Sequence, residues 1–462
     1  MDHKDRFIDL SLSGAALAEA GGHVLAAYVL RVAEGCDFLT VVARLAAESG
    51  RGTALPLSTE DGFSRSLDVV AYEADAESGL VRLAFPLALF DFNVTDGGAS
   101  ISSFLNLLAG NTQGMEGVAA LKLHDFHLPE SYLQGFAGPA ATIAGLWRHL
   151  GRDESAGSMV VGAILKPKLG LRPGGLAAAA YEFWRGGDLV ENDQPQGNQG
   201  FAPLAEVLPL MADALKRAED ETGTGKVFSM NITCDDPAEM DARAEMALQA
   251  FAGMTESLAF HVDAYLAGPM ALAHARRRYG GHFLSAHRAG HAAVTSVRSE
   301  RGYSAFVLTK IARLLGASGI HTGTMGFGRM EGDESDRPIA CMIAQDRAAG
   351  PYFVQEWHGM ARSAAIVSGG INALRLPSFM ENLGHTNFIL AAGGGAFGHI
   401  DGPAAGALSL RQAEACWLER ADPIEWAVEH PEFRRAFHSF ESDADIIHPG
   451  WRRVFSPENT NL

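Results

Sequence analysis

Residues 186–199, GGDLVENDQPQGNQ, combine a short apolar run with a cluster of side-chain oxygens. Glu191, Asp193 and Gln194 stand together just after the run. Carboxylate and amide oxygens are the ligands that a hard cation such as Mg²⁺ prefers. These three residues are therefore predicted metal ligands at the end of a strand.

Polar residues also follow the other apolar runs in the second part of the chain. The eight runs are residues 159–165, 188–190, 227–232, 258–262, 283–286, 319–322, 364–367 and 388–392. The polar or glycine residues in or after them are Lys166, Glu191 with Asp193, Asn231, Asp263, His287 with Arg288, His321, Ser368, and the glycines at 393–395. For any single residue, above all a lone histidine, a cap or loop role is the simpler interpretation. As a set, they indicate an active site.

The spacing of these runs predicts the elements that hold the polar residues. Helical stretches such as 203–222, 237–251 and 303–315 separate the runs, which favours parallel strands. Eight strand–helix units predict a closed (β/α)8 TIM barrel, whose active site lies at the carboxyl ends of the strands. The fold class is therefore α/β, and the eight strand ends should converge on one site.

The first part of the chain reads as a separate, smaller domain. Residues 24–30 and 80–87 resemble strands, and residues 38–49 resemble a helix. The breakers in 135–139, GFAGP, suggest a boundary. We predict an N-terminal α+β domain over 1–137, a barrel over 138–440 and a C-terminal extension over 441–462.

The composition of the chain limits the classes of molecule that it is expected to bind. The 462 residues carry a net charge of −18, which disfavours both nucleic acid and anionic membranes. No apolar run is long enough to span a bilayer, and the start of the chain lacks the apolar run of a signal peptide. The four cysteines do not form a metal-binding pattern. A cytoplasmic protein is expected.

Longer motifs make the chain resemble the form II large subunit of Rubisco, from about residue 5 to residue 453. The motifs are VGAILKPKLGLRP at 161–173, HRAGH at 287–291, GIHTGTMGFG at 319–328, SGG at 368–370 and GGGAFGH at 393–399. The resemblance implies a homodimer, or an oligomer of dimers, whose active sites are shared between subunits. It implies a small sugar phosphate as the ligand.

The resemblance also assigns roles residue by residue. Lys166, Lys168, His287, Glu48 and Asn111 match catalytic positions, with Glu48, Thr53 and Asn111 supplied by the N-terminal domain of the partner. Substrate-binding positions are matched by Thr53, Arg288, His321, Arg329, Ser368, Gly370, Gly393 and Gly394. The expected metal ion is Mg²⁺, held by Glu191, Asp193 and Gln194.

Three of these positions depart from the family pattern. Where this chain has Glu191, the family carries a lysine that CO₂ modifies. Where this chain has Gln194 and Arg329, the family carries a glutamate and a loop lysine. A carbamate cannot form on glutamate, and a neutral amide binds Mg²⁺ more weakly than a carboxylate does. Magnesium is therefore expected to bind weakly or not at all. The planar fork of Arg329 suits a carboxylate that is already present on the ligand.

These departures lead to one main interpretation and two alternatives. The main interpretation is a Rubisco-like enzyme that acts on a sugar phosphate or sugar-acid phosphate through an enediolate, by enolisation or β-keto acid decarboxylation, and carboxylates poorly. The first alternative is a working ribulose-1,5-bisphosphate carboxylase with a carbamate-free metal site. The second is a non-catalytic sugar-phosphate-binding protein.

Overall fold

A computed structural model describes residues 4–154, 157–333 and 336–455 of the chain. The chain divides into two compact units. The first consists of Met1–Pro139, Gly290–Gly316 and Cys341–Arg362, and the second of Ala140–Ala289, Ala317–Ala340 and Ser363–Leu462. The first unit thus includes two segments from later in the chain, and the domain limits at residues 137 and 440 stay predictions.

The first unit is built on a five-stranded sheet in the order β10-β4-β1-β3-β2. The strands are β1 (His23–Val32), β2 (Val70–Ala74), β3 (Leu80–Pro86), β4 (Val118–His127) and β10 (Gly302–Tyr303). Strand β1 is antiparallel to β3 and β4, whereas β10 runs parallel to β4. The predicted N-terminal α+β arrangement is confirmed.

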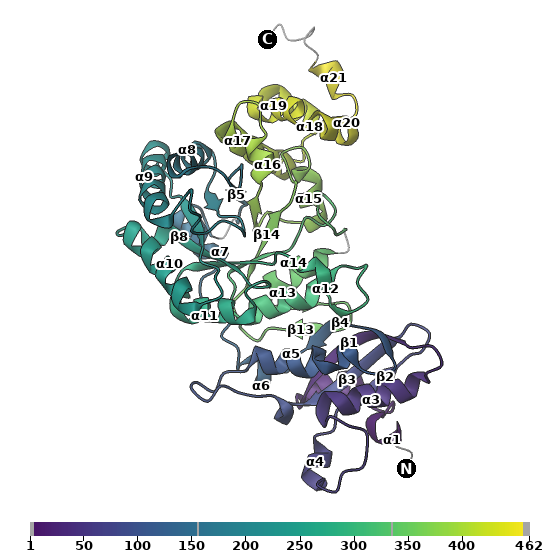
Figure 1. Ribbon diagram of the computed structural model, residues 1–462. Helices are drawn as coiled ribbons and strands as arrows, with labels where there is room; N and C mark the ends of the chain where they lie inside the picture. The colour runs from purple at the N-terminus through teal and green to yellow at the C-terminus, as the bar shows by residue number, and fades with distance from the viewer. Residues whose placement is uncertain (1–3, 155–156, 334–335, 456–462) are drawn as a thin grey trace. The chain divides into compact units, whose positions relative to one another are not determined.

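Helices accompany this sheet. They are α1 (Lys4–Phe7), α2 (Gly14–Ala20), α3 (Phe38–Gly50), α4 (Gly62–Ser66), α5 (Ile101–Ala109), α6 (Glu130–Leu133), α12 (Ala292–Thr295) and α13 (Ala305–Leu314). Helix α3 packs against β2 and β3 (Figure 1). Its N-terminus is capped by Asp37, which accepts a hydrogen bond from the backbone N–H of Thr40 at 2.9 Å.

A fully buried ion pair joins α13 to the sheet. Nζ of Lys310 lies 3.1 Å from Oδ1 of Asp125, and both side chains are inaccessible to solvent. The other oxygen of Asp125 accepts hydrogen bonds from the backbone N–H groups of Tyr352 and Phe353. A buried charge needs such partners, because an unpaired one is costly to desolvate.

The second unit is a closed barrel of eight parallel strands. The strands, in barrel order, are β5 (Val160–Ile164), β6 (Leu189–Glu191), β7 (Val227–Asn231), β8 (Leu258–Asp263), β9 (Phe283–His287), β11 (Gly319–His321), β14 (Ala364–Ser368) and β15 (Phe388–Ala391). All eight predicted strands are present with ends shifted by at most a few residues, so the predicted TIM barrel is confirmed.

Helices flank the barrel strands (Figure 1). They are α8 (Pro173–Trp184), α9 (Leu204–Thr222), α10 (Pro237–Ala250), α11 (Pro269–Tyr279), α15 (Leu376–Leu383), α16 (Gly393–Phe397) and α17 (Pro403–Leu418). Short helices follow: α18 (Pro423–Glu429), α19 (Pro431–Ser439), α20 (Glu441–Ile447) and α21 (Trp451–Val454). Within the described ranges, no helix combines the length and apolar character that a membrane span requires.

The amino end of the barrel is filled by apolar side chains. Val160, Leu189, Val227, Ala259 and Phe283 form one buried cluster, and each stands at or near the start of its strand. Helix α7 (Ile143–His149) adds buried apolar residues to the same cluster. Layers of branched side chains are the usual filling of such barrels. This core supports the polar layer that lies further along the strands.

Candidate active site

The lining of the barrel becomes polar toward the carboxyl ends of the strands. Ser229 and Ser285, at the middle of β7 and β9, are buried, with their hydroxyl oxygens 3.4 Å apart. Beyond this level stand Lys166, Asp193, Asn231, Asp263, His287, His321 and Ser368. Because parallel strands end at one rim, residues far apart in the sequence converge there.

Asp193 brings the two predicted catalytic lysines together. Its Oδ2 lies 3.5 Å from Nζ of Lys166 and 3.5 Å from Nζ of Lys168. The lysine side chains keep 36% and 43% of their surface exposed, whereas Asp193 is buried. An accessible ammonium group held by a buried carboxylate can exchange a proton with a bound ligand.

The loop that carries Asp193 is fixed by Asn231. The Asn231 amide donates to the backbone carbonyl of Gln194 at 3.0 Å and to that of Gln196 at 2.8 Å. The side chain of Gln196 in turn accepts a hydrogen bond from the backbone N–H of Asp193 at 2.5 Å. Asn231 therefore has a positioning role, which explains a polar residue at the end of β7.

Glu191 lies inside the barrel, between two histidines. Its Oε1 is 3.1 Å from Nδ1 of His261, and its Oε2 is 3.3 Å from Nε2 of His321. All three side chains are at most 4% exposed. Burial raises the pKa of Glu191, but His321 and His261 lower it more, so the net shift is well below the ordinary value.

Asp263 orients His287 at the end of β9. Its Oδ2 lies 3.1 Å from Nδ1 of the imidazole and accepts the backbone N–H of Ala289 at 2.9 Å. Burial, together with the neighbouring His321, lowers the pKa of His287 to about 4. The ring is therefore neutral near pH 7, the form in which an imidazole can accept a proton.

One side of the rim is suited to an anion. His321 Nδ1 lies 3.1 Å from the hydroxyl of Ser368. Burial lowers the pKa of Arg288 to about 10, and its buried Nη1 finds no hydrogen-bond partner within the described ranges. A buried guanidinium nitrogen without a partner favours an incoming acceptor such as a phosphate oxygen.

The loop of Arg329 packs on the turn after β14. The backbone N–H of Arg329 donates to the carbonyl of Gly369 at 2.7 Å. Gly370 has φ +101°, and a Cβ there would stand 2.8 Å from Cγ of Arg329. Gly370 is thus required for the close approach of this loop, and its predicted contact with the substrate stays a prediction.

Gly393 lies directly beside Lys166. A Cβ at this position would stand 2.8 Å from Cε of Lys166 and 2.6 Å from the carbonyl oxygen of Ile164. Gly394, which has open space around it, follows in α16. The predicted contact of Gly393 and Gly394 with a phosphate stays a prediction.

The three predicted N-terminal contributors belong to the first unit. Glu48 stands near the end of α3, Thr53 follows that helix, and Asn111 opens a short 3-10 helix over Asn111–Gly114. The Thr53 hydroxyl accepts a hydrogen bond from the backbone N–H of Leu55 at 3.1 Å. Their role at the site of a partner subunit stays a prediction.

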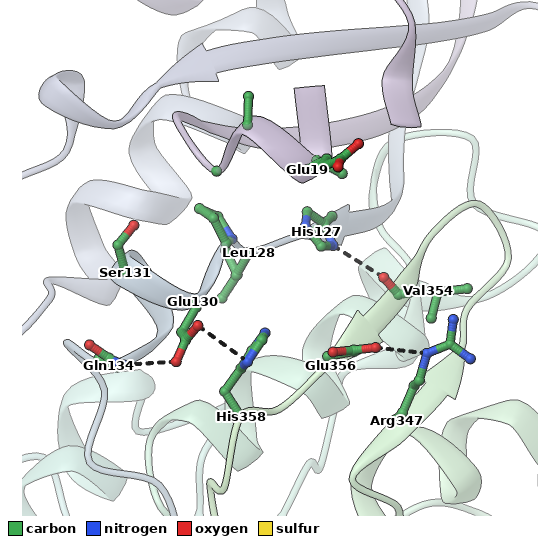
Figure 2. Close-up of a pocket in the computed structure, with 14 residues that line it drawn as sticks. Glu19, His127, Leu128, Glu130, Ser131, Gln134, Arg347, Val354, Glu356 and His358 are labelled. Carbon is green, nitrogen blue, oxygen red and sulfur yellow. Dashed lines mark hydrogen bonds and ion pairs between the residues drawn. The ribbon is translucent and has the colours of Figure 1, made fainter. Parts of the chain in front are cut away.

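A separate hollow of about 670 Å³ lies within the first unit (Figure 2). Two pairs of its lining side chains contact each other: Arg347 with Glu356 at 2.9 Å, and His358 with Glu130 at 3.5 Å. His127 Nδ1 lies 3.1 Å from the Val354 carbonyl oxygen. None of the predicted site residues lines this hollow.

The residues predicted to hold magnesium have other partners in this structure. Asp193 faces two lysines, Glu191 faces two histidines, and Gln194 is neutral. A small hard cation prefers converging oxygen ligands in near-octahedral geometry. The donor set fits Mg²⁺ poorly, and we assign no catalytic step to this ion.

Comparison with known proteins places the chain in a family. The catalytic domain of the ribulose bisphosphate carboxylase large chain matches residues 142–440, and the N-terminal domain of that chain matches residues 11–132. This chain belongs to the Rubisco large-chain family. Both matches follow the order of the two folds along the sequence.

Rubisco relatives match over nearly the whole chain. Proteins named ribulose bisphosphate carboxylase from Rhodopseudomonas palustris (strain TIE-1) and Dechloromonas aromatica (strain RCB) are each 54% identical over 99% of this chain and 100% of their own length. The dimeric archaeal Rubisco from Hyperthermus butylicus is 30% identical with a TM-score of 0.84, covering 95% of this chain and 99% of the other. The octameric Rubisco from Pyrococcus horikoshii OT3 is 28% identical with a TM-score of 0.83, covering 95% and 97%.

Sequence reasoning missed His261. This residue stands within the apolar run 258–262, where nothing around it suggests chemistry. The signal is its position: it is two residues before Asp263 and so faces the same side of β8. A histidine on the inward face of a barrel strand needs a buried polar partner, which here is Glu191.

Proposed function

We propose that this chain is an enzyme that acts on ribulose 1,5-bisphosphate, forms its enediolate and adds CO₂ without a carbamate. The observation that carries the proposal is the 54% identity, over nearly the full length of both chains, to proteins named ribulose bisphosphate carboxylase. Relatives this similar over their whole length favour a shared substrate and reaction. This choice favours the first alternative of the sequence analysis over its main interpretation.

In the proposed reaction, Lys166 is the acid/base. Its Nζ is accessible at the rim and is held by Asp193 at 3.5 Å. The lysines and the neutral His287 stand at the same rim of the barrel, where a proton would be removed from the carbon next to the substrate carbonyl, and the ammonium groups stabilise the negative oxygen that develops. Arg288 and Ser368, with His321 positioned beside Ser368 at 3.1 Å, are proposed to bind one phosphate, and Gly393 and Gly394 are proposed to bind the other.

A second candidate is a Rubisco-like enzyme that forms an enediolate from a sugar phosphate or sugar-acid phosphate but carboxylates poorly. The pairing of Glu191 with two histidines favours it, because this residue is not free to replace a carbamate at the rim. Arg329 also favours it, since its fork suits a ligand carboxylate. A non-catalytic binding protein is the third candidate.

Two assays separate the candidates. Incubation of the purified chain with ribulose bisphosphate and ¹⁴CO₂ should give acid-stable label if it carboxylates. Exchange of the substrate's carbon-bound proton into D₂O, followed by NMR, reports enolisation alone. Exchange without fixation would select the second candidate, and the absence of both would select the third.

We also propose a homodimer, or an oligomer of dimers, whose sites are completed by the partner. Solved relatives titled dimeric and octameric support this assembly. The test mixes two inactive variants, Lys166→Met and Glu48→Gln, after partial unfolding and refolding. Shared sites predict that activity returns, because each mixed dimer then contains one site with neither substitution. No recovery, with mixed dimers present, would exclude shared sites.

A further inference from the structure

Three polar atoms in the barrel interior lack hydrogen-bond partners. Among the residues that the structure describes, these are Oε2 of Glu191 and Nε2 of His321, which lie 3.3 Å apart without the geometry of a hydrogen bond, and Nε2 of His261. All three side chains are buried. Burying such groups without partners is costly, so a missing ligand is a natural explanation.

The geometry of these residues fits a metal ion. One ligand atom from each of Glu191, His261 and His321 can be chosen so that all three lie within 4.8 Å of one another. Oε1 of Glu191 lies 3.1 Å from Nδ1 of His261, and Oε2 of Glu191 lies 3.3 Å from Nε2 of His321. Ligands bound at about 2.0–2.1 Å in a tetrahedron lie roughly 3.4 Å apart, so small adjustments would suffice.

We propose that Glu191, His261 and His321 form a binding site for a first-row divalent transition metal such as Zn²⁺, separate from Asp193. Two imidazoles and one carboxylate suit zinc, iron or cobalt, whereas Mg²⁺ prefers oxygen ligands. Asp193 does not belong to this group of ligands. The carbamate position of the family is thus used for a different kind of metal chemistry.

The surroundings of His321 support ligation through Nε2. Its other ring nitrogen, Nδ1, lies 3.1 Å from the Ser368 hydroxyl. A hydrogen bond at the second nitrogen is what fixes the ring of most metal-binding histidines. The metal would therefore hold His321 toward Ser368 and link the barrel interior to the anion-binding side of the rim.

The first measurement is the metal content of the untagged protein. Inductively coupled plasma mass spectrometry after expression in zinc-supplemented medium should find close to one zinc per chain. Expression is the suitable stage for loading, because the three side chains are nearly inaccessible once the barrel is folded. Dialysis against Mg²⁺ should not displace the zinc. The measurement needs no substrate, so its failure is separate from failure of the proposed function.

Two variants and a matched control locate the site. Glu191→Gln and His261→Leu should each weaken Zn²⁺ binding by more than about a hundredfold, since even second-shell changes cost 10–100-fold. Asp193→Asn, the control from the rim, should bind Zn²⁺ as the unmodified chain does. Circular dichroism checks that each variant folds.

Other outcomes would overturn the proposal. These are a chain that takes up no zinc, variants that bind as tightly as the unmodified chain, or an Asp193→Asn variant that loses zinc equally. If His261→Leu fails to fold, the visible spectrum of the Co²⁺-loaded unmodified chain decides. Bands of a low-coordinate histidine-bound ion support the site, and the spectrum of hydrated Co²⁺ contradicts it.

Discussion

The carboxylate of Glu191 and the imidazole of His261 lie 3.1 Å apart inside the barrel, on β6 and β8. Both side chains are at most 1% exposed. The residue predicted to replace the family's modified lysine therefore has a specific buried partner of its own. Because of this pair, the effect of replacing Glu191 alone should depend on His261.

Glu191→Lys should not introduce activation by CO₂. A carbamate on the new lysine would still lack an acidic neighbour, because Gln194 is neutral and binds Mg²⁺ more weakly than a carboxylate does, and Arg329 would stay in place. The combination Glu191→Lys, His261→Leu, Gln194→Glu and Arg329→Lys should do better, since it removes the histidine and restores an acidic ligand. The measurement is the fixation rate with and without CO₂ pre-incubation; CO₂ activation of the single variant would contradict this reasoning.

Lys166→Met should abolish proton exchange while leaving ligand binding nearly intact. Lysine and methionine have similar volumes, and the Lys166 side chain is partly exposed, so the fold should tolerate the change. Exchange into D₂O measures the first effect and a ligand-induced thermal shift the second. Exchange that persists near its original rate would exclude Lys166 as the acid/base.

Arg329→Ala should weaken ligands that carry a carboxylate more than plain sugar phosphates. The guanidinium fork can form two parallel hydrogen bonds to a carboxylate, and alanine removes both. Thermal shifts with a sugar-acid phosphate and with the matching sugar phosphate give the comparison. Equal weakening of the two ligands would show that Arg329 supplies only general positive charge.

Asp125→Ala should destabilise the first unit by about 3–5 kcal/mol. It leaves Lys310 buried without its carboxylate partner, and such broken pairs are strongly destabilising. The matched control is Asp346→Ala, which breaks the exposed pair with Arg362 and should cost about 0–1 kcal/mol. Urea unfolding of each variant measures the difference. Similar losses for the two would mean that burial of the Lys310 pair adds nothing.

Most of the barrel could be predicted from the sequence because its strands are short apolar runs between regular helices. The ends of these runs also identify the rim residues, since parallel strands end together. It is harder to predict from the sequence whether a side chain near the end of a strand points to the rim or into the barrel. Glu191 looked like a rim ligand beside Asp193, yet the structure turns it toward His261 and His321.

His261 shows why the rest of the site was missed. A single histidine in an apolar run gives no periodic signal, and its partner is 70 residues away in the sequence. Only the closed barrel brings β6 and β8 close enough for the contact. Tertiary packing likewise decides that the later segments Gly290–Gly316 and Cys341–Arg362 belong to the first unit. Local sequence patterns do not indicate such packing.

The most direct test of the central claim is CO₂ fixation with ribulose bisphosphate, measured with and without pre-incubation in CO₂ and Mg²⁺. A carbamate-free carboxylase should fix label at a rate that pre-incubation does not change, because Glu191 cannot form a carbamate. Failure to fix any label, or a rate that rises after pre-incubation, would contradict the account.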